Sequence, residues 1–179
     1  KKLEADRKER MGSKTAAAKK DIAADSAAIP DLENRLQKLK GKRKKLGDAI
    51  GLVLAKSEGE NVVGVKARLA RMKSDLSSYA KDSTALASDL SEIKAACAKW
   101  KSSGSSSGKG SGSPSALAKV EEEALRINRG RSRVEYELKK AEAYFEDSTK
   151  ALFVCVSELV RAGVSFSTSE KETVRGLSN

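Results

Sequence analysis

The residues best placed to do chemistry in this sequence are cationic. Seven basic side chains and no acidic one lie between positions 35 and 45: Arg35, Lys38, Lys40, Lys42, Arg43, Lys44 and Lys45. Because like charges repel one another along a helix, such a cluster is expected to attract an anionic membrane, a nucleic acid or an acidic protein surface. It is the candidate anion- or lipid-binding site, together with Arg68, Arg71 and Lys73.

Two structural alternatives for this basic cluster stay open at the level of sequence. The cluster can pair with Glu121, Glu122 and Glu123 further along the chain, or it can be an ordinary solvated helix face. Reversing the charge of Lys42, Arg43, Lys44 and Lys45 to Glu separates a lipid-binding module, which should lose its affinity for liposomes, from a scaffold, which should keep its partner.

Enzymatic chemistry is not indicated. The sequence contains no His, the commonest acid–base residue and metal ligand, so His-dependent hydrolysis and zinc chemistry are excluded. The run Gly104–Gly110 resembles a phosphate-binding loop only superficially, because three residues separate Gly104 from Gly108 and Gly follows Lys109. That loop requires four residues between its glycines, and Ser or Thr after its lysine. We therefore expect no enzyme, no catalytic residue, no metal and no cofactor.

The composition favours long helices over a thick globular core. The chain has 179 residues and a formal net charge of +11, with 39% hydrophobic, 4% aromatic and 34% charged residues. Helices that bury a narrow apolar stripe suit such a balance. The charge is uneven, because residues 1–50 hold 15 basic and 8 acidic side chains, whereas residues 114–179 hold 11 of each.

Apolar residues recur at alternating spacings of three and four in three segments, which is the heptad pattern of a coiled coil. The pattern predicts an all-α fold in which three long antiparallel helices form an elongated coiled coil or three-helix bundle. Its polar exceptions are Arg43, Ser83, Arg131 and Ser148, which either fix the register or leave the seam locally open. The principal predicted seam residues are Leu32, Leu36, Leu39, Leu69, Leu76, Leu86, Leu90, Ile93, Trp100, Ile127, Leu138, Phe145 and Leu152.

Boundary signals divide the predicted helices. Pro30 is expected to kink the first helix or to start a new one, and a Ser-rich and Gly-rich run is typical of a flexible linker. Ser169 and Glu172 have the spacing of a cap for a last short helical turn. The predicted organisation is a basic helical hairpin over 1–101 (first helix about 3–56, second about 61–101), a linker over 102–115, a third helix over 116–163 and a polar tail over 164–179.

The two cysteines, Cys97 and Cys155, both fall on the predicted seam, so we expect them to be buried small hydrophobes that do not pair. Low cysteine usage fits a reducing intracellular compartment, and we expect a cytoplasmic protein, with association at a membrane surface as a variant. The longest apolar run, residues 151–156, is too short to cross a bilayer. The opening at Lys1, without Met, is typical of a piece of a longer protein.

The stretch Arg133-Val-Glu-Tyr-Glu-Leu-Lys-Lys-Ala-Glu-Ala-Tyr-Phe-Glu-Asp147 resembles the last helix of BAR domains, including those of sorting nexins. Those domains are antiparallel dimers of three long, kinked helices that bind curved anionic membranes through basic side chains. The resemblance implies a BAR-like module in which the basic cluster, with Arg68, Arg71 and Lys73, binds lipid phosphates.

The leading functional hypothesis is a non-catalytic helical scaffold or assembly module. It would bind protein partners through the helical seam, or associate with itself as a dimer. The BAR-like membrane module is the alternative. Nucleic-acid binding comes third, because the basic residues are not interleaved with aromatic ones as they are in RNA-recognition modules.

Overall fold

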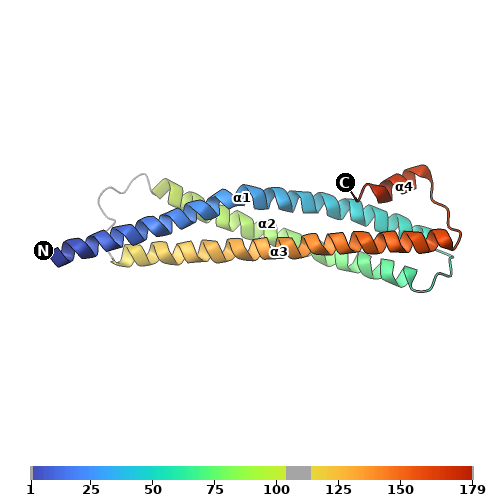
Figure 1. The fold of residues 1–179 in the computed structure, drawn as a ribbon, viewed down its shortest axis with the longest axis horizontal. Coiled ribbons are helices and arrows are strands. Elements are labelled where there is room, and N and C mark those ends of the chain that lie inside the picture. Colours follow the sequence, from blue (N-terminus) through green and yellow to red (C-terminus); the bar gives the residue numbers. More distant parts are fainter. Residues whose placement is uncertain (1, 104–113, 179) are drawn as a thin grey trace. The chain divides into compact units, whose positions relative to one another are not determined.

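The computed structural model describes residues 2–103 and 114–178, which fold as four helices (Figure 1). Helix α1 spans Lys2–Lys56, α2 spans Val65–Ser103, α3 spans Pro114–Arg161 and α4 spans Thr168–Arg175. These described residues contain no strand, so the all-α prediction is confirmed. The prediction of three helices is wrong, because α4 is a fourth. Most of the predicted linker lies outside the described residues.

Local sequence explains where the long helices stop. Gly59 and Gly64 adopt positive φ angles of 81° and 80° in the connection between α1 and α2, a conformation that glycine enters without steric cost. Helix α3 ends in a Schellman motif around Gly163, whose φ is 95°. The amide of Val164 donates to the carbonyl of Leu159, and the amide of Gly163 donates to that of Val160, both at 3.0 Å. Gly163 thus terminates α3.

Helix α4 occupies the segment expected to be a polar tail. Its N-cap is Ser167, whose hydroxyl accepts from the amide of Glu170 while the carboxylate of Glu170 accepts from the amide of Ser167. This reciprocal capping box replaces the expected pair of Ser169 and Glu172. Phe166, just before the N-cap, and Val174 within α4 are both buried, which a polar-tail prediction does not anticipate.

The chain divides into two compact units, and each is described separately. Unit 1 comprises Lys1–Asn34 and Leu86–Glu137, and unit 2 comprises Arg35–Ala85 and Leu138–Asn179. The three boundaries between the units, at 34/35, 85/86 and 137/138, fall inside α1, α2 and α3. Each unit therefore contains one segment from each of α1, α2 and α3, and unit 2 also contains α4.

Helices α2 and α3 run antiparallel within each unit. In unit 1, Asp89 lies opposite Arg133, while Ile93 lies opposite Gly130. In unit 2, Arg68 pairs with Glu158 and Tyr79 stacks on Tyr144, with ring centroids 4.2 Å apart. In both units, rising numbers on α2 meet falling numbers on α3. This is the antiparallel sense that the sequence predicts for these two helices.

The predicted seam residues form the cores of these units. Twelve of the thirteen are buried, and only Trp100 is half-buried. Among the polar exceptions, Ser148 is buried, whereas Arg43, Ser83 and Arg131 are half-buried. The heptad pattern therefore identifies side chains that the chain uses to pack against itself.

Helix α1 passes through Pro30 without ending, so the expectation of a new helix at this position is wrong. Pro30 is exposed, and a proline inside a helix removes one backbone hydrogen bond. The continuing apolar pattern explains why the helix persists, because Ile29 and Leu32 on either side of Pro30 are both buried in unit 1. Among the described residues, no helix contains an apolar stretch that could cross a bilayer.

Candidate functional site

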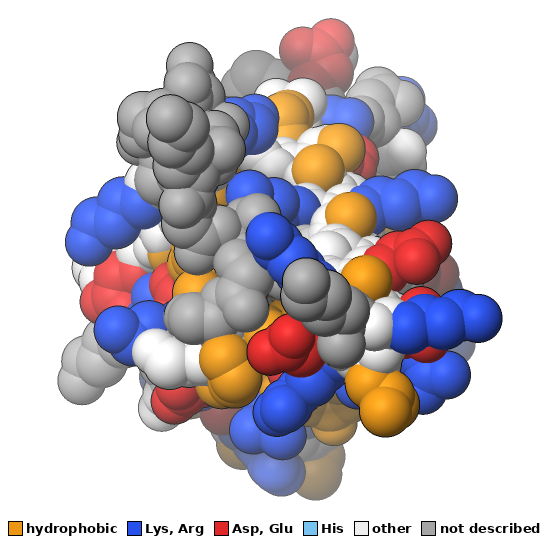
Figure 2. Space-filling view, turned by 90° about the vertical axis from the view of Figure 1, so that its left-hand side faces the viewer, with side chains coloured by type: hydrophobic (Ala, Val, Ile, Leu, Met, Phe, Trp, Pro, Cys, Tyr) orange, Lys and Arg blue, Asp and Glu red, His pale blue; other side chains and the backbone are white. Residues whose placement is uncertain are grey.

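The basic cluster lies wholly on α1 in unit 2, and its seven cations account for most of the net positive charge of the chain. Unit 2 contains 19 basic and 11 acidic residues, a balance of +8, whereas unit 1 contains 17 and 14, a balance of +3. Figure 2 shows the end of unit 1 where α1 begins, and there blue cationic and red acidic side chains are interspersed. The excess of positive charge therefore belongs to unit 2.

Helical geometry divides the lysines of the cluster between two flanks of α1. Lys38, Lys42 and Lys45 are spaced by four and three residues, which places them on one flank. Lys40 and Lys44 are four residues apart on another flank. All five are exposed, whereas Arg43 is half-buried at its seam position. The cluster is therefore two rows of lysines and not one continuous patch.

Arg35 does not contribute a free charge to either row. Its Nε donates to Glu142 Oε1 at 2.9 Å and its second terminal nitrogen donates to Glu142 Oε2 at 2.8 Å. This bidentate pair joins α1 to α3 and lowers the pKa of Glu142, chiefly through the hydrogen bonds, although burial acts in the opposite direction. Arg35 acts as a link between helices, because its guanidinium holds the carboxylate of Glu142 within unit 2.

The three candidates on α2 occupy different environments from the cluster. Arg68 forms an ion pair with Glu158 of α3, and Arg71 lies 4.0 Å from Asp75 on its own helix. Lys73 is exposed, and no ion pair involves it among the described residues. Among the described residues, no ion pair or side-chain hydrogen bond joins these three side chains to the lysines of the cluster.

A groove between α1 and α3 in unit 2 adjoins the row of Lys38, Lys42 and Lys45. Its volume is about 1060 Å³. The three lysines line it from α1, and Glu146 and Lys150 line it from α3. Apolar side chains also contribute: Leu39 and Phe145, which are buried, and Phe153, which is half-buried. Residues Gly176, Leu177 and Ser178, which follow α4, complete the lining.

Two ion pairs lie within this groove, and among the described residues no ion pair involves its other three cations, Lys38, Lys42 and Lys45. Glu142 pairs with Arg35 at 2.8 Å and Glu146 pairs with Lys150 at 2.8 Å. The hydrogen bond and charge of Lys150, and more weakly the charge of Lys42, lower the pKa of Glu146. Five cationic and two anionic side chains line the groove, so its net charge is +3.

Unit 1 contains a polar site of a different kind, buried between α1 and α3. Arg131 donates from Nε to Asp25 Oδ1 at 2.5 Å and from a terminal nitrogen to Glu135 at 2.9 Å. Asn128 also donates to both oxygens of Asp25 at 3.3 Å. The side chain of Asp25 is only 7% exposed. This ion-pair network fills a seam position that apolar residues occupy elsewhere.

The heptad pattern identifies Arg131 as a polar exception, but Asp25, its partner, was not predicted. The signal is nevertheless present, because position 25 falls three residues after Ile22 and four before Ile29. Two oppositely charged residues on the seams of two helices are candidates for a buried pair. Identifying them as partners requires the relative register of those helices, which heptad spacing alone does not provide.

Both cysteines are free and buried. Burial raises the pKa of Cys97, and the nearby charge of Asp25 adds to that effect, while a hydrogen bond with Ser26 opposes it. Burial also raises the pKa of Cys155. Raised pKa values keep the thiols protonated and weakly nucleophilic, so these side chains behave as core residues.

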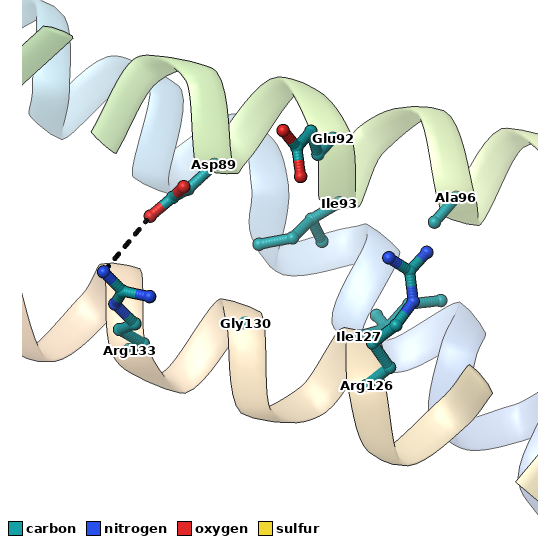
Figure 3. A pocket seen from close by; sticks show the side chains of 8 residues that line it. All are labelled: Asp89, Glu92, Ile93, Ala96, Arg126, Ile127, Gly130 and Arg133. Carbon is teal, nitrogen blue, oxygen red and sulfur yellow. Dashed lines mark ion pairs between the residues drawn. The ribbon is translucent and has the colours of Figure 1, made fainter. Parts of the chain in front are cut away.

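A small pocket between α2 and α3 of unit 1 is a packing feature (Figure 3). Its volume is about 190 Å³, less than the roughly 300 Å³ at which ligand pockets begin. Ile93 projects toward Gly130, where a Cβ would lie 3.0 Å from Ile93 Cδ1. Asp89 and Arg133 span one edge at 4.0 Å. Gly130 is therefore required for close approach of the two helices.

The described residues contain no group of three or more Cys, Asp and Glu side chains arranged to hold a metal ion. Comparison with protein-family models, with curated proteins and with solved structures gives no match to this chain. The lysine row beside the groove of unit 2 is therefore the candidate functional site on geometric and electrostatic grounds.

Proposed function

We propose that this chain is a non-catalytic helical assembly module that binds an acidic protein partner through the α1 surface of unit 2. The observation that carries the proposal is the set of five exposed lysines on this surface. Among the described residues, no ion pair involves Lys38, Lys40, Lys42, Lys44 or Lys45, and unit 2 carries a balance of +8.

The packing of the two units supports a partner surface outside the helical seam. The seam side chains are buried within the cores of the chain itself, so a partner that bound through them would have to displace a helix. The lysines, in contrast, are already exposed. Complementary charges accelerate association and align the partner, and a lysine row on a rigid helix presents those charges at fixed spacing.

An anionic membrane is the second candidate, because lipid phosphates can neutralise the same lysines and because of the BAR-like resemblance of residues 133–147. The position of Lys38, Lys42 and Lys45 disfavours the third candidate, a nucleic acid. These three line a groove that also contains Phe145 and Phe153, so a ligand there needs an apolar face as well as negative charge. A nucleic-acid backbone provides only the charge.

The test compares two sets of charge reversals on one helix. One variant carries Glu at the five exposed lysines of α1 in unit 2, and the matched control carries Glu at five exposed lysines of α1 in unit 1: Lys2, Lys8, Lys14, Lys19 and Lys20. Circular dichroism verifies that both variants remain helical. The probes are an acidic helical peptide, phosphatidylserine vesicles and a DNA duplex, each titrated at low and at physiological salt.

The proposal predicts that the peptide binds the wild-type chain and the unit 1 variant, and that reversal in unit 2 weakens binding by at least about tenfold. It also predicts that vesicles and DNA bind more weakly than the peptide at physiological salt. Equal loss of peptide binding in both variants, or preferential binding to vesicles or DNA, would overturn the proposal.

A further inference from the structure

The groove of unit 2 presents its lysines at the spacing of a helix. Lys38, Lys42 and Lys45 follow one another at four and three residues along α1. At about 1.5 Å rise per residue, the row extends over roughly 10.5 Å. Acidic side chains spaced by four and three residues on a second helix would span the same distance.

The apolar part of the groove provides a second condition on its ligand. Leu39 of α1 and Phe145 of α3 are buried, and Phe153 of α3 is half-buried. Phe153 therefore still exposes apolar area that a ligand can cover. A groove between two packed helices has the shape that receives the side-chain ridges of a third, and an amphipathic helix that enters such a groove is an established form of recognition.

The charges in the groove determine the sign and number of the ligand's polar groups. Glu142 and Glu146 are paired with Arg35 and Lys150. The three remaining cations are the lysines of the row. A matching ligand needs about three carboxylates along one edge of its apolar face.

We infer that this groove docks an acidic amphipathic helix of a protein partner. The helix carries carboxylates at i, i+4 and i+7, or in the reverse order if it lies antiparallel to α1. These carboxylates face Lys38, Lys42 and Lys45, and the apolar side chains beside them cover Phe153. The inference rests on the proposed function, to which it adds the location of the site and the form of the ligand.

The chain itself supplies a matched control for the lysines. The variant K38E/K42E reverses two charges in the groove, whereas K40E/K44E reverses two charges that are also exposed and have the same spacing, on the other flank of α1. The probe is a labelled synthetic helix with Glu at i, i+4 and i+7 beside a row of Leu. A scrambled peptide of the same composition serves as the second probe.

The apolar condition has its own pair of variants. Phe153→Ser removes the half-buried ring from the groove, whereas Val154→Ser changes its neighbour, which is 50% exposed and does not line the groove. Phe153→Leu keeps an apolar side chain at the same position. Helical content measured by circular dichroism identifies any variant that fails to fold.

Fluorescence anisotropy should show that K38E/K42E weakens binding of the patterned peptide about tenfold, and that K40E/K44E weakens it less than about threefold. Phe153→Ser should weaken it about fivefold, while Phe153→Leu and Val154→Ser should remain close to wild type. The scrambled peptide should bind about tenfold more weakly than the patterned one.

The contradicting outcomes distinguish this inference from the proposed function. If K38E/K42E and K40E/K44E weakened peptide binding equally, the groove would not be the binding site, but the proposed basic partner surface would stand. Equal affinity for the patterned and scrambled peptides would overturn the helical form of the ligand. Displacement of the patterned peptide by phosphatidylserine vesicles at a lower concentration of anionic groups would identify lipid as the occupant and overturn both.

Discussion

Unit 1 and unit 2 are built from the same three helices, yet they use charge in opposite ways. Unit 1 buries an ionic network, in which Asp25 and Arg131 occupy seam positions. Unit 2 has a cluster of aromatic rings between α2 and α3, where Tyr79, Tyr144 and Phe145 lie within 6.2 Å of one another by ring centroid. Unit 2 instead displays its lysines on the exposed surface of α1.

The difference concerns two roles of charged residues, fixing the register of helices and binding a partner, which a heptad pattern alone cannot distinguish. A buried ion pair stabilises a fold little more than apolar residues of the same size would, but removing only one of its two partners is strongly destabilising. Polar seam residues can also fix the register of packed helices. An exposed lysine row contributes little to folding and is available to a partner. We therefore propose that the polar network of unit 1 fixes the register of its helices and that the surface of unit 2 binds the partner.

The largest expected effect comes from the aromatic core of unit 2. Phe145→Ala should destabilise the chain by about 4 kcal/mol, because it leaves a cavity where a ring 5% exposed packs against Tyr79 and Tyr144. Urea denaturation followed by circular dichroism measures the change. Phe153→Ala is the matched control on the same helix and should cost clearly less, because Phe153 is only half-buried. Similar losses for both would refute the described core.

The second effect concerns the ionic core of unit 1. Asp25→Ala should cost about 3 kcal/mol, because it leaves Arg131 partly buried with Glu135 as its remaining carboxylate partner. Glu33→Ala removes the exposed pair with Lys94 and should cost less than about 1 kcal/mol. The double variant D25L/R131L should recover most of the loss, because no buried charge remains unpaired. Failure to recover would count against the network as a closed unit.

A smaller effect tests the end of α3, which leads to α4 in unit 2. Gly163→Ala should destabilise the chain by about 1 kcal/mol, because a side chain strains the left-handed conformation at φ 95°. Gly51→Ala should instead stabilise it by about 0.5–1 kcal/mol, since Gly51 is helical and a Cβ there would meet nothing within 4 Å. Thermal unfolding of the two variants should therefore shift in opposite directions, and a shift in the same direction would contradict this helix end.

The smallest effect is a pH dependence in unit 2. The pKa of Glu142 is lowered by its hydrogen bonds with Arg35, so the pair stabilises the fold fully above the unfolded pKa of about 4.3. That contribution is lost as pH falls through the folded pKa. Since the Glu142 side chain is 39% exposed, Glu142→Gln should cost less than about 1 kcal/mol at neutral pH.

The difference in stability between the wild-type chain and Glu142→Gln should therefore shrink as the solution is acidified. Glu146→Gln provides a comparison on the same helix, because Glu146 pairs with Lys150 at the exposed surface. A difference between wild type and Glu142→Gln that grows on acidification would have the wrong sign and would contradict the pair.

The fold was predictable where the sequence repeats itself. Alternating three- and four-residue spacing identified buried residues such as Leu69, Leu90 and Leu138. Residues at this spacing lie on one face of a helix, and that face packs into the core along the whole helix. The bounds of α4 were not predicted, because this helix has a single buried residue, Val174, and the buried Phe166 precedes its N-cap. A segment this short does not repeat a hydrophobic pattern, and from the sequence either Ser167 or Ser169 could be the N-cap.

The candidate site was only partly predictable, because partners on other helices depend on register. The sequence identified Arg35 and Lys38 as equivalent members of one basic cluster. In the structure Arg35 is held by Glu142 across 107 positions, whereas Lys38 borders the groove. The division of the lysines into two flanks follows from the helical turn alone and could have been derived from spacing. Which flank borders the groove could not.

The most direct test of the account is a map of where an acidic helix contacts the whole chain. Nuclear magnetic resonance of the isotope-labelled protein, titrated with the patterned acidic peptide, reports each backbone amide. We expect shifts concentrated at Lys38–Lys45 of α1 and at Glu142–Phe153 of α3, with the amides around Asp25 and Arg131 unchanged. Shifts centred on unit 1, or no saturable shifts at all, would contradict the assignment of recognition to unit 2.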